Sequence, residues 1–321
     1  MVEFEHRIDP ELRIVIRQMP DRDLEDLPGQ RLKSDEMLKA MRAGIASSDF
    51  VRKEDYLIPG RAMDPMVRVR IYRPTAQLAE IGCLVWIHGG GYVAGSIVQD
   101  EPICECIVES VGCAVVSVDY RLAPENPFPA AAEDCYAALR WASQNADHLG
   151  LIADRFAIGG ASSGAGAAAA VALMVRDRGE LDLLFQLLDY PMLDDRAPVT
   201  PTQMVTYPKV WNLAANELSW RSYLGSAYGT DDVSPYAAPA RAADLTGLPP
   251  SFIGVGQLDL FVEEDIAYAQ RLISAGVPTE LHVYPGATHG FDILVPTAEV
   301  SRRFVRDRND ALRRVLQQRT Q

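Results

Sequence analysis

The stretch Gly160-Ala161-Ser162-Ser163-Gly164 decides how this chain folds. It fits the pattern G-x-S-x-G, in which a serine occupies a sharp and strained turn between a strand and a helix. Glycine is needed two residues on either side because such a turn leaves no room for side chains there. Centring the pattern on Ser163 would put alanines at both glycine positions, so Ser162 is predicted to occupy the apex.

The sequence on both sides of this turn supports the same interpretation. Residues 155–159 are typical of a short buried strand, and residues 165–175 of a helix rich in small side chains. The first N–H groups of that helix would point at Ser162 and favour negative charge beside it. We therefore expect the strained turn to hold the serine hydroxyl out above the sheet, at the end of a strand.

The composition indicates a globular protein with a sizeable core. The chain has 321 residues, of which 48% are hydrophobic, enough for one large α/β domain or two small ones. Its net charge of -13 and pI of about 4.9 argue against nucleic acid or an anionic membrane as a partner. Residues 156–175 are uncharged, but they contain the serine turn and are rich in Gly, Ser and Ala. They therefore predict strand, turn and helix rather than a membrane span.

Cysteine usage and the first residues predict a cytoplasmic protein. The five cysteines form no C-x-x-C pair and are expected to be reduced, buried thiols. The opening residues lack the basic region and apolar run of a secretory signal. The sequence also implies no metal and no organic cofactor.

Strands and helices alternate along most of the chain. Strands are predicted at residues 51–58, 66–72, 83–87, 114–118, 156–159, 183–188, 252–255 and 280–284. Helices are predicted at residues 99–110, 130–145, 165–178, 263–275 and 297–318. This alternation predicts an eight-stranded, mostly parallel sheet with helices on both faces and a site at the carboxyl ends of the strands. The strand at 66–72 alternates apolar and basic side chains, which predicts an exposed edge.

Two regions lie outside this alternation and are expected to cover the strand ends. A helix is predicted to start at Asp9-Pro10, followed by a second at residues 34–43. The segment 194–248 is too long for a simple loop and too aromatic for a linker. The expected organisation is a helical cap from residues 1–50 and 194–248, and an α/β core from residues 51–193 and 249–321.

Acyl transfer through a serine requires a general base, which elimination assigns to His289. Of the five histidines, His6 lies in the N-terminal arm, His148 in a polar stretch, and His282 inside a strand. His88 opens a glycine run. His289 follows the last strand in a loop, where a mobile imidazole is useful.

The acid that orients the base is expected one strand–helix unit earlier. Asp259 follows the strand at 252–255, and its apolar neighbours predict burial beside a partner such as His289. Glu263, Glu264 and Asp265 are alternatives, although acidic residues also fit the first turn of the next helix.

A glycine run predicts an oxyanion hole. The sequence HGGGY at residues 88–92 follows a core strand, and glycines let backbone N–H groups approach and face a ligand. The N–H groups of Gly90 and Gly91, with that of Ser163, are the predicted donors. His88 and Gly89 are expected to support this loop.

Several motifs together resemble one known family. These are HGGGY at 88–92, DYRLAPE at 119–125, PFPAA at 127–131, Glu133-Asp134, and the serine turn with Asp259 and His289. In this combination the chain, from about residue 50 to its end, resembles the hormone-sensitive-lipase family of α/β-hydrolases, specifically its bacterial esterases. The resemblance implies an α/β-hydrolase fold, a cap from the segments before the first strand and around 200–230, and frequent homodimers.

Two positions depart from the family pattern. Ala161 stands where the family usually has Asp or Thr, and Leu260 stands where the acid is usually followed by proline. Neither change removes a catalytic group, but both change how neighbouring loops are held and therefore bear on substrate preference.

The expected activity is that of a carboxylesterase acting on a small-molecule ester. An amidase or deacetylase would use the same triad, so these activities stay open. A non-catalytic ligand receptor of the same fold is disfavoured because such proteins lack the histidine present at 289. The predicted substrate pocket suits short acyl chains and consists of Tyr92, Trp211, Leu213, Leu260 and Phe291.

Overall fold

The computed structural model describes residues 5–19, 48–76, 80–196 and 209–317, together with positions 27, 29, 31 and 36. The helix predicted at residues 34–43 and the part of the insertion at residues 197–208 lie outside the described residues, apart from position 36.

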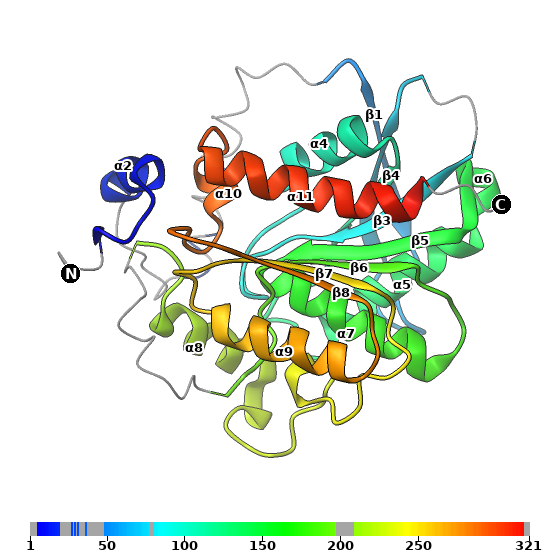
Figure 1. Cartoon of the computed structure of the whole chain (residues 1–321). Helices are drawn as coiled ribbons and strands as arrows, with labels where there is room; N and C mark the ends of the chain where they lie inside the picture. The colour runs from blue at the N-terminus through cyan, green and yellow to red at the C-terminus, as the bar shows by residue number, and fades with distance from the viewer. Residues whose placement is uncertain are drawn as a thin grey trace.

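One eight-stranded sheet forms the centre of the molecule (Figure 1). Its order is β1-β2-β4-β3-β5-β6-β7-β8. The strands are β1 (Val51–Ile58), β2 (Val67–Pro74), β3 (Ile81–Ile87), β4 (Ala114–Asp119), β5 (Leu151–Ala161), β6 (Phe185–Asp189), β7 (Ser251–Gly256) and β8 (Thr279–Tyr284). Strand β2 is antiparallel to both of its neighbours and all other pairs are parallel, so the predicted mostly parallel sheet is confirmed.

The prediction of β2 as an exposed edge was wrong, because β1 pairs along its outer side. The basic residues that suggested an edge are satisfied by ion pairs. Arg68 and Arg70 both pair with Asp55 of β1, and Arg70 also pairs with Glu101, 2.8 Å away. The alternation of apolar and basic side chains along β2 therefore reflects charged pairs across to β1 rather than an unpaired strand edge.

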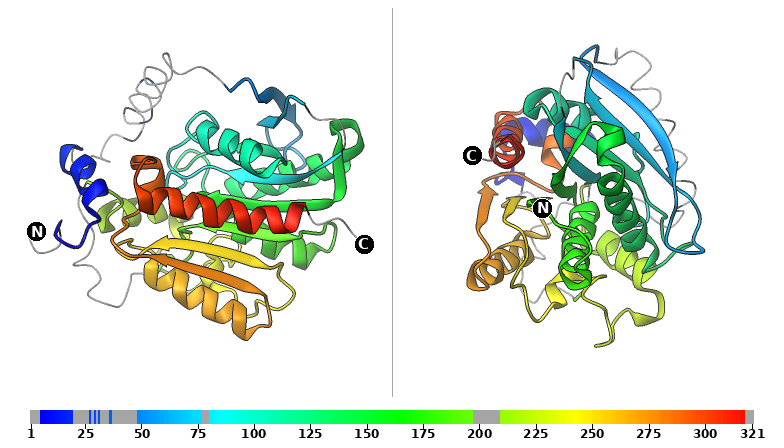
Figure 2. Two further views of the ribbon diagram at one scale, coloured as in Figure 1. Left: turned by 45° about the horizontal axis from the view of Figure 1, so that its top comes forward. Right: turned by 90° about the vertical axis from the view of Figure 1, so that its right-hand side faces the viewer.

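Helices cover both faces of the sheet (Figure 2). One face carries α4 (Glu101–Val111) and α11 (Glu299–Leu316), and the other carries α5 (Ala130–Gln144), α7 (Ser163–Arg178) and α9 (Val262–Ser274). These five helices begin and end within two residues of the predicted bounds. The short helices α6 (Ala146–Leu149) and α10 (Phe291–Leu294) precede β5 and α11.

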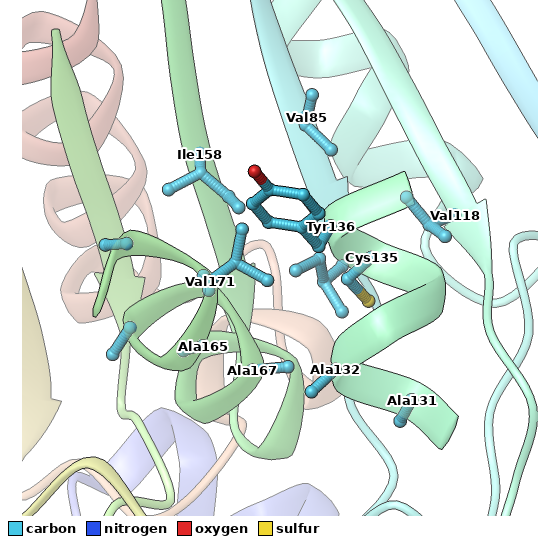
Figure 3. Packing of buried hydrophobic residues seen from close by; sticks show 14 of the residues in the cluster. Val85, Val118, Ala131, Ala132, Cys135, Tyr136, Ile158, Ala165, Ala167 and Val171 are labelled. Carbon is cyan, nitrogen blue, oxygen red and sulfur yellow. The ribbon is translucent and has the colours of Figure 1, made fainter. Parts of the chain in front are cut away.

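The small side chains of α7 allow it to pack closely against the sheet and α5. Figure 3 shows Val85 and Ile158 of the sheet, Cys135 of α5 and Val171 of α7 in this core. All are buried, and burial of each valine- or isoleucine-sized side chain stabilises the fold by about 1.5–3 kcal/mol. This packing fixes the serine turn, because α7 begins at Ser163.

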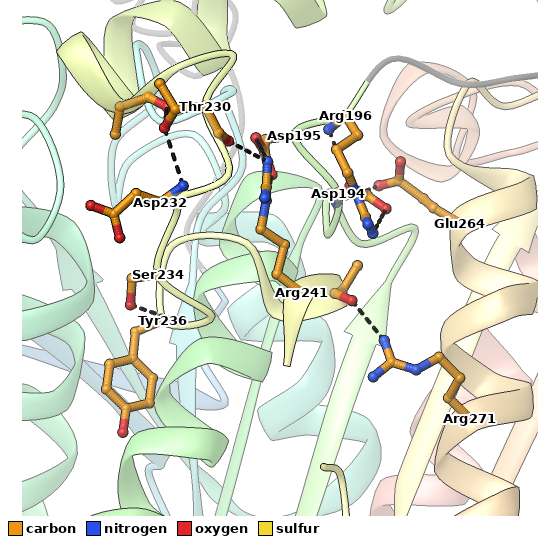
Figure 4. A network of polar contacts seen from close by, with 12 residues as sticks. Asp194, Asp195, Arg196, Thr230, Asp232, Ser234, Tyr236, Arg241, Glu264 and Arg271 are labelled. Carbon is orange, nitrogen blue, oxygen red and sulfur yellow. Dashed lines mark hydrogen bonds and ion pairs between the residues drawn. The ribbon is translucent and has the colours of Figure 1, made fainter. Parts of the chain in front are cut away.

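The segment between β6 and β7 contains α8 (Leu213–Leu224) and two 3-10 turns, η2 (Gly225–Ala227) and η3 (Pro239–Arg241). Polar contacts tie it to the core (Figure 4). Within the segment, Arg241 pairs with the buried Asp195 at 2.6 Å. Arg271 of α9 holds the segment to the core by donating to the carbonyl of Ala240 at 2.6 Å. The division into cap and core stays a prediction.

Helix α2 (Pro10–Gln18) begins as expected, with the Asp9 side chain accepting a hydrogen bond from the N–H of Glu11. Its buried face packs into the molecule, and the N–H of Asp9 donates to the carbonyl of Gly286 at 2.9 Å. Lys209, at the start of the described part of the insertion, donates to the carbonyl of Arg17. The N-terminal helix therefore contacts the loop that precedes His289.

All five cysteines are free, and four of them are buried as expected, but Cys106 is half-buried. None of the helices in the described ranges is both long and apolar enough to cross a bilayer.

Candidate active site

Ser162 occupies a strained turn between β5 and α7. Its φ of 58° lies in the left-handed region, which non-glycine residues seldom adopt. The neighbouring glycines are required by contact: a Cβ on Gly160 would lie 2.5 Å from the carbonyl oxygen of Ile87, and one on Gly164 would lie 2.1 Å from it. The end of β3 therefore presses against the turn, and no larger residue fits at either glycine.

Three side chains from separate loops meet at this turn. His289 Nε2 lies 3.0 Å from Ser162 Oγ, and His289 Nδ1 lies 2.8 Å from Asp259 Oδ2. A carboxylate only accepts hydrogen bonds, so Nδ1 carries the proton that it donates to Asp259. Nε2 is then free to accept the serine proton, as a general base must.

The carboxylate of Asp259 is fully buried and held from a second side. Its Oδ1 accepts a hydrogen bond of 3.0 Å from the N–H of Phe261, while its Oδ2 faces His289. Of the alternatives, Glu263 is exposed. Glu264 instead accepts from the N–H of Leu193 at 2.8 Å.

Asp265 is a second fully buried carboxyl group behind the site. Neither of its oxygens has a hydrogen-bond partner among the described residues. Burial raises its pKa well above the usual range, and the nearby carboxyls of Glu264 and Asp259 raise it further. Asp265 is therefore held as a neutral acid rather than as the partner of His289.

This burial predicts a pH-dependent effect on stability. Because the folded pKa of Asp265 is raised, the folded state keeps a proton that the unfolded state releases above about pH 4. Stability is then lost as pH rises, by about 1.4 kcal/mol per pH unit, until the folded group ionises. Asp265→Asn, a neutral side chain of the same shape, should therefore gain stability over wild type as pH rises. Urea unfolding of both proteins at pH 5 and pH 8 measures this, and an equal difference at both values would contradict it.

The glycine run lies directly against the serine turn. A Cβ on Gly89 would lie 2.9 Å from the carbonyl oxygen of Ala161. Gly90 and Gly91 have φ values of 129° and 63°, which glycine adopts without strain. Ser163 is the first residue of α7, so its N–H has no acceptor within the helix. The three predicted oxyanion donors thus come from adjoining backbone segments.

His88 is held under this loop by its neighbours. Its ring is fully buried and stacks on Tyr120 with centroids 4.2 Å apart, and the Tyr120 hydroxyl donates to the His88 carbonyl at 2.9 Å. Burial lowers the pKa of His88, which keeps the ring neutral. These contacts support the expected bracing role for His88 and place the motif at 119–125 behind the loop.

Trp211 lies over the site from the insertion, just before α8. Its ring centroid is 6.0 Å from that of His289, and its Cη2 would be 2.5 Å from a Cβ on Gly91. The ring thus touches both the base and the glycine loop. Leu213 is half-buried at the start of α8, and Leu260 is buried beside Asp259.

The other two predicted pocket residues are packed within the core. Tyr92 stacks on Tyr223 of α8 with centroids 3.8 Å apart. Phe291 packs edge-on against Phe304 of α11, with centroids 5.2 Å apart. These contacts give both rings a packing role, and their place in a substrate pocket stays a prediction.

A buried polar group beside the triad was not predicted from the sequence. Tyr190 directly follows β6, and its hydroxyl donates to Asp292 at 2.9 Å. Arg308 of α11 is 1% exposed, and its guanidinium lies 3.1 Å from the carboxylate of Asp189. Burial raises the pKa of Asp189 to about 7, although the positive charge of Arg308 opposes this rise. The position of Tyr190 at a strand's carboxyl end could have identified it, since Asp259 was found that way. No local signal marks Arg308 as buried, because the carboxylate that it lies nearest, Asp189, is 119 residues away along the chain.

Within the described residues, no cluster of histidine, cysteine and carboxylate side chains is arranged to hold a metal ion.

Comparison with known proteins agrees with this geometry. A family model described as an alpha/beta hydrolase fold matches residues 84–293. The carboxylesterase NlhH of Mycobacterium tuberculosis is 35% identical over 246 residues, which cover 72% of this chain and 74% of that protein. An ethyl acetate hydrolase of Pseudomonas putida is 32% identical, covering 79% of this chain and 84% of its own. The structure of a bacterial heroin esterase superposes with a TM-score of 0.92 at 41% identity, covering 98% of this chain and 99% of that one.

The sheet, its two helical layers and the matched sequence define an α/β-hydrolase. The chain belongs to this family, and within it to the hormone-sensitive-lipase group of carboxylic-ester hydrolases. The expected family and enzyme class are thereby confirmed.

Proposed function

We propose that this chain is a serine carboxylesterase that hydrolyses short-chain esters through an acyl-enzyme intermediate. The observation that carries the proposal is the continuous chain of hydrogen-bond distances from Ser162 through His289 to Asp259, 3.0 Å and 2.8 Å long. The curated relatives named carboxylesterase and ethyl acetate hydrolase support the same chemistry.

In the acylation half-reaction, His289 Nε2 takes the hydroxyl proton as Ser162 Oγ bonds to the ester carbonyl carbon. The carbonyl oxygen becomes an anion, which the N–H groups of Gly90, Gly91 and Ser163 stabilise. The tetrahedral intermediate then collapses, the bond to the alcohol oxygen breaks, and His289 protonates the departing alcohol.

Deacylation repeats the sequence with water. His289 removes a proton from water as the water oxygen bonds to the acyl carbon, and the proton passes to Ser162 Oγ as the carboxylic acid leaves. Asp259 keeps the imidazole in the productive tautomer and stabilises its charge in both halves. No metal or organic cofactor takes part in this proposal, and a homodimer and a cytoplasmic location remain predictions.

Ester and amide substrates discriminate the proposed activity from its rivals. We expect matched p-nitrophenyl esters to be cleaved far faster than the corresponding anilides. A higher kcat/KM for anilides would favour an amidase. A non-catalytic receptor would release no burst of alcohol from an activated ester.

Trp211 is expected to limit the length of the acyl group. A closed apolar pocket gains about 0.8 kcal/mol per added methylene until the chain meets its wall, beyond which overpacking reverses the trend. Because Trp211 contacts both His289 and Gly91, its ring is placed to form that wall. We expect kcat/KM to peak at short acyl chains in wild type and at longer chains in Trp211→Ala.

An acyl-length series of p-nitrophenyl esters measures this shift. Leu218→Ala, at a half-buried leucine of α8 that packs against the apolar core, is a suitable control for loss of side-chain volume in the insertion. A peak that Trp211→Ala leaves in place, or a profile that rises to long chains in wild type, would remove Trp211 from the pocket.

A further inference from the structure

Tyr190 holds a backbone conformation that its residue type disfavours. Its φ is 40°, in the left-handed region, and the residue is almost fully buried at the carboxyl end of β6. Its N–H donates to the carbonyl of Gly254 in β7 at 2.7 Å. Strain of this kind persists only where the surroundings impose it, and it concentrates at functional sites.

The ring of Tyr190 faces the imidazole of His289. The two centroids are 5.0 Å apart with an interplanar angle of 70°, an edge-to-face contact. Phe261 makes a second edge-to-face contact with the same imidazole, at 5.1 Å and 87°. His289 lies on a loop, and its hydrogen bonds to Asp259 and Ser162 still allow the imidazole to rotate about the line between them. Contacts with the rings of Tyr190 and Phe261 restrict that rotation.

The hydroxyl of Tyr190 is fixed by a buried ionic group. It donates to Asp292 Oδ1 at 2.9 Å, and the other oxygen of Asp292 lies 3.9 Å from Nη1 of Arg308. The same Nη1 donates to Asp189 at 3.1 Å. All of these side chains are at least nine-tenths buried.

This ionic group also reaches the nucleophile. The carbonyl of Asp189 accepts the N–H of Ser162 at 2.9 Å. Arg308, from the C-terminal helix, therefore holds one residue that anchors the serine backbone and one that anchors the ring beside the base. A buried ion pair adds little stability compared with well-packed apolar side chains, so stability alone does not account for it.

We propose that Tyr190 is a positioning residue that fixes the imidazole of His289 for proton transfer, with its hydroxyl anchored by Asp292 and Arg308. The inference rests on the proposed function, since it takes His289 as the base. A catalytic group displaced by a fraction of an ångström loses much of its effect, so loosening this ring should reduce turnover rather than binding.

The test is Tyr190→Phe, which removes the hydroxyl and keeps the ring. We expect kcat on a short-chain p-nitrophenyl ester to fall about tenfold while KM changes less than about twofold. The downfield proton resonance of His289 Nδ1–H should also move, because it reports the geometry of the imidazole against Asp259.

Tyr284→Phe is a matched control. Tyr284 also donates its hydroxyl to a carboxylate, that of Asp307, at 2.8 Å, and it also packs against Phe304. The described ring contacts of Tyr284 do not include His289. This variant should keep the wild-type kcat and the His289 resonance, whatever its effect on thermal stability.

Changes at Asp292 test the anchor independently. Asp292→Asn keeps an oxygen that accepts from Tyr190, so kcat should stay within about threefold of wild type. Asp292→Ala removes the acceptor and should match Tyr190→Phe, and Arg308 would still be paired with Asp189. The double variant Tyr190→Phe, Asp292→Ala should have the same kcat as either single variant, because both changes break the same hydrogen bond.

The outcomes separate this inference from the proposed function. A kcat of Tyr190→Phe equal to that of Tyr284→Phe, with an unmoved His289 resonance, would overturn the positioning role and leave the esterase proposal intact. If wild type and Tyr284→Phe both lack ester hydrolysis, the proposed function itself fails and Tyr190 has no base to position.

Discussion

Replacement of Ser162 by alanine is expected to lower kcat for ester hydrolysis by about 10⁴–10⁶-fold while leaving the fold intact. The hydroxyl is the only group that the change removes, and Oγ lies 3.0 Å from the base. Ser162 is largely buried at the N-cap position of α7, and its side chain makes no capping hydrogen bond there, so alanine is expected to fit without loss of a cap. Initial rates under saturating substrate, with far-UV circular dichroism as a check on folding, measure the effect.

Ser163→Ala is the matched control, because Ser163 is the adjoining serine and its Oγ is buried without a partner among the described residues. Its predicted contribution is the backbone N–H, which alanine retains. We expect this variant to keep most of the wild-type turnover. The reverse pattern, an inactive Ser163→Ala and an active Ser162→Ala, would show that the nucleophile is assigned to the wrong serine.

Changes to the base and the acid should be nearly as severe. His289→Ala is expected to reduce kcat as much as the serine change does, because the two side chains act as one unit. Asp259→Asn should lower kcat by about 10⁴-fold, since an asparagine amide favours the tautomer with the proton on the wrong nitrogen. The double variant Ser162→Ala, His289→Ala should be no worse than either single variant.

Glu263→Gln provides a control for the acid, because Glu263 is an exposed carboxylate four residues along the chain. Its turnover should match wild type. Near-normal turnover in Asp259→Asn would instead transfer the orienting role to another carboxylate, and Glu264, which is hydrogen-bonded to the N–H of Leu193, would be the next to test.

The parts of the fold that sequence could predict are those determined by local spacing. The glycines at 160 and 164 marked the turn because close backbone contacts with Ile87 exclude every side chain there. The five long helices were predicted almost to their ends, since their apolar periodicity is local. Asp259 and His289 followed from their positions after strands, and the structure brings them within hydrogen-bond distance.

The parts that sequence could not predict depend on partners distant along the chain. β2 resembled an edge strand because nothing local shows that Asp55 of β1 pairs with its arginines. Arg308 lies on a helix with many exposed arginines, and only the folded chain shows that it is buried beside Asp189. Tyr190 likewise could not be linked to the site from sequence, because the ring that it contacts belongs to His289, 99 residues further along the chain.

The central claim, that Ser162 is the nucleophile of an ester hydrolase, is tested most directly by covalent labelling. A fluorophosphonate reacts with an activated serine and leaves a stable adduct, which digestion and mass spectrometry assign to one residue. We expect a single adduct on Ser162 in wild type, formed as ester hydrolysis is lost, and no adduct in Ser162→Ala or His289→Ala. An adduct on Ser163 or on another peptide, or full esterase activity in a protein that is never labelled, would contradict this claim.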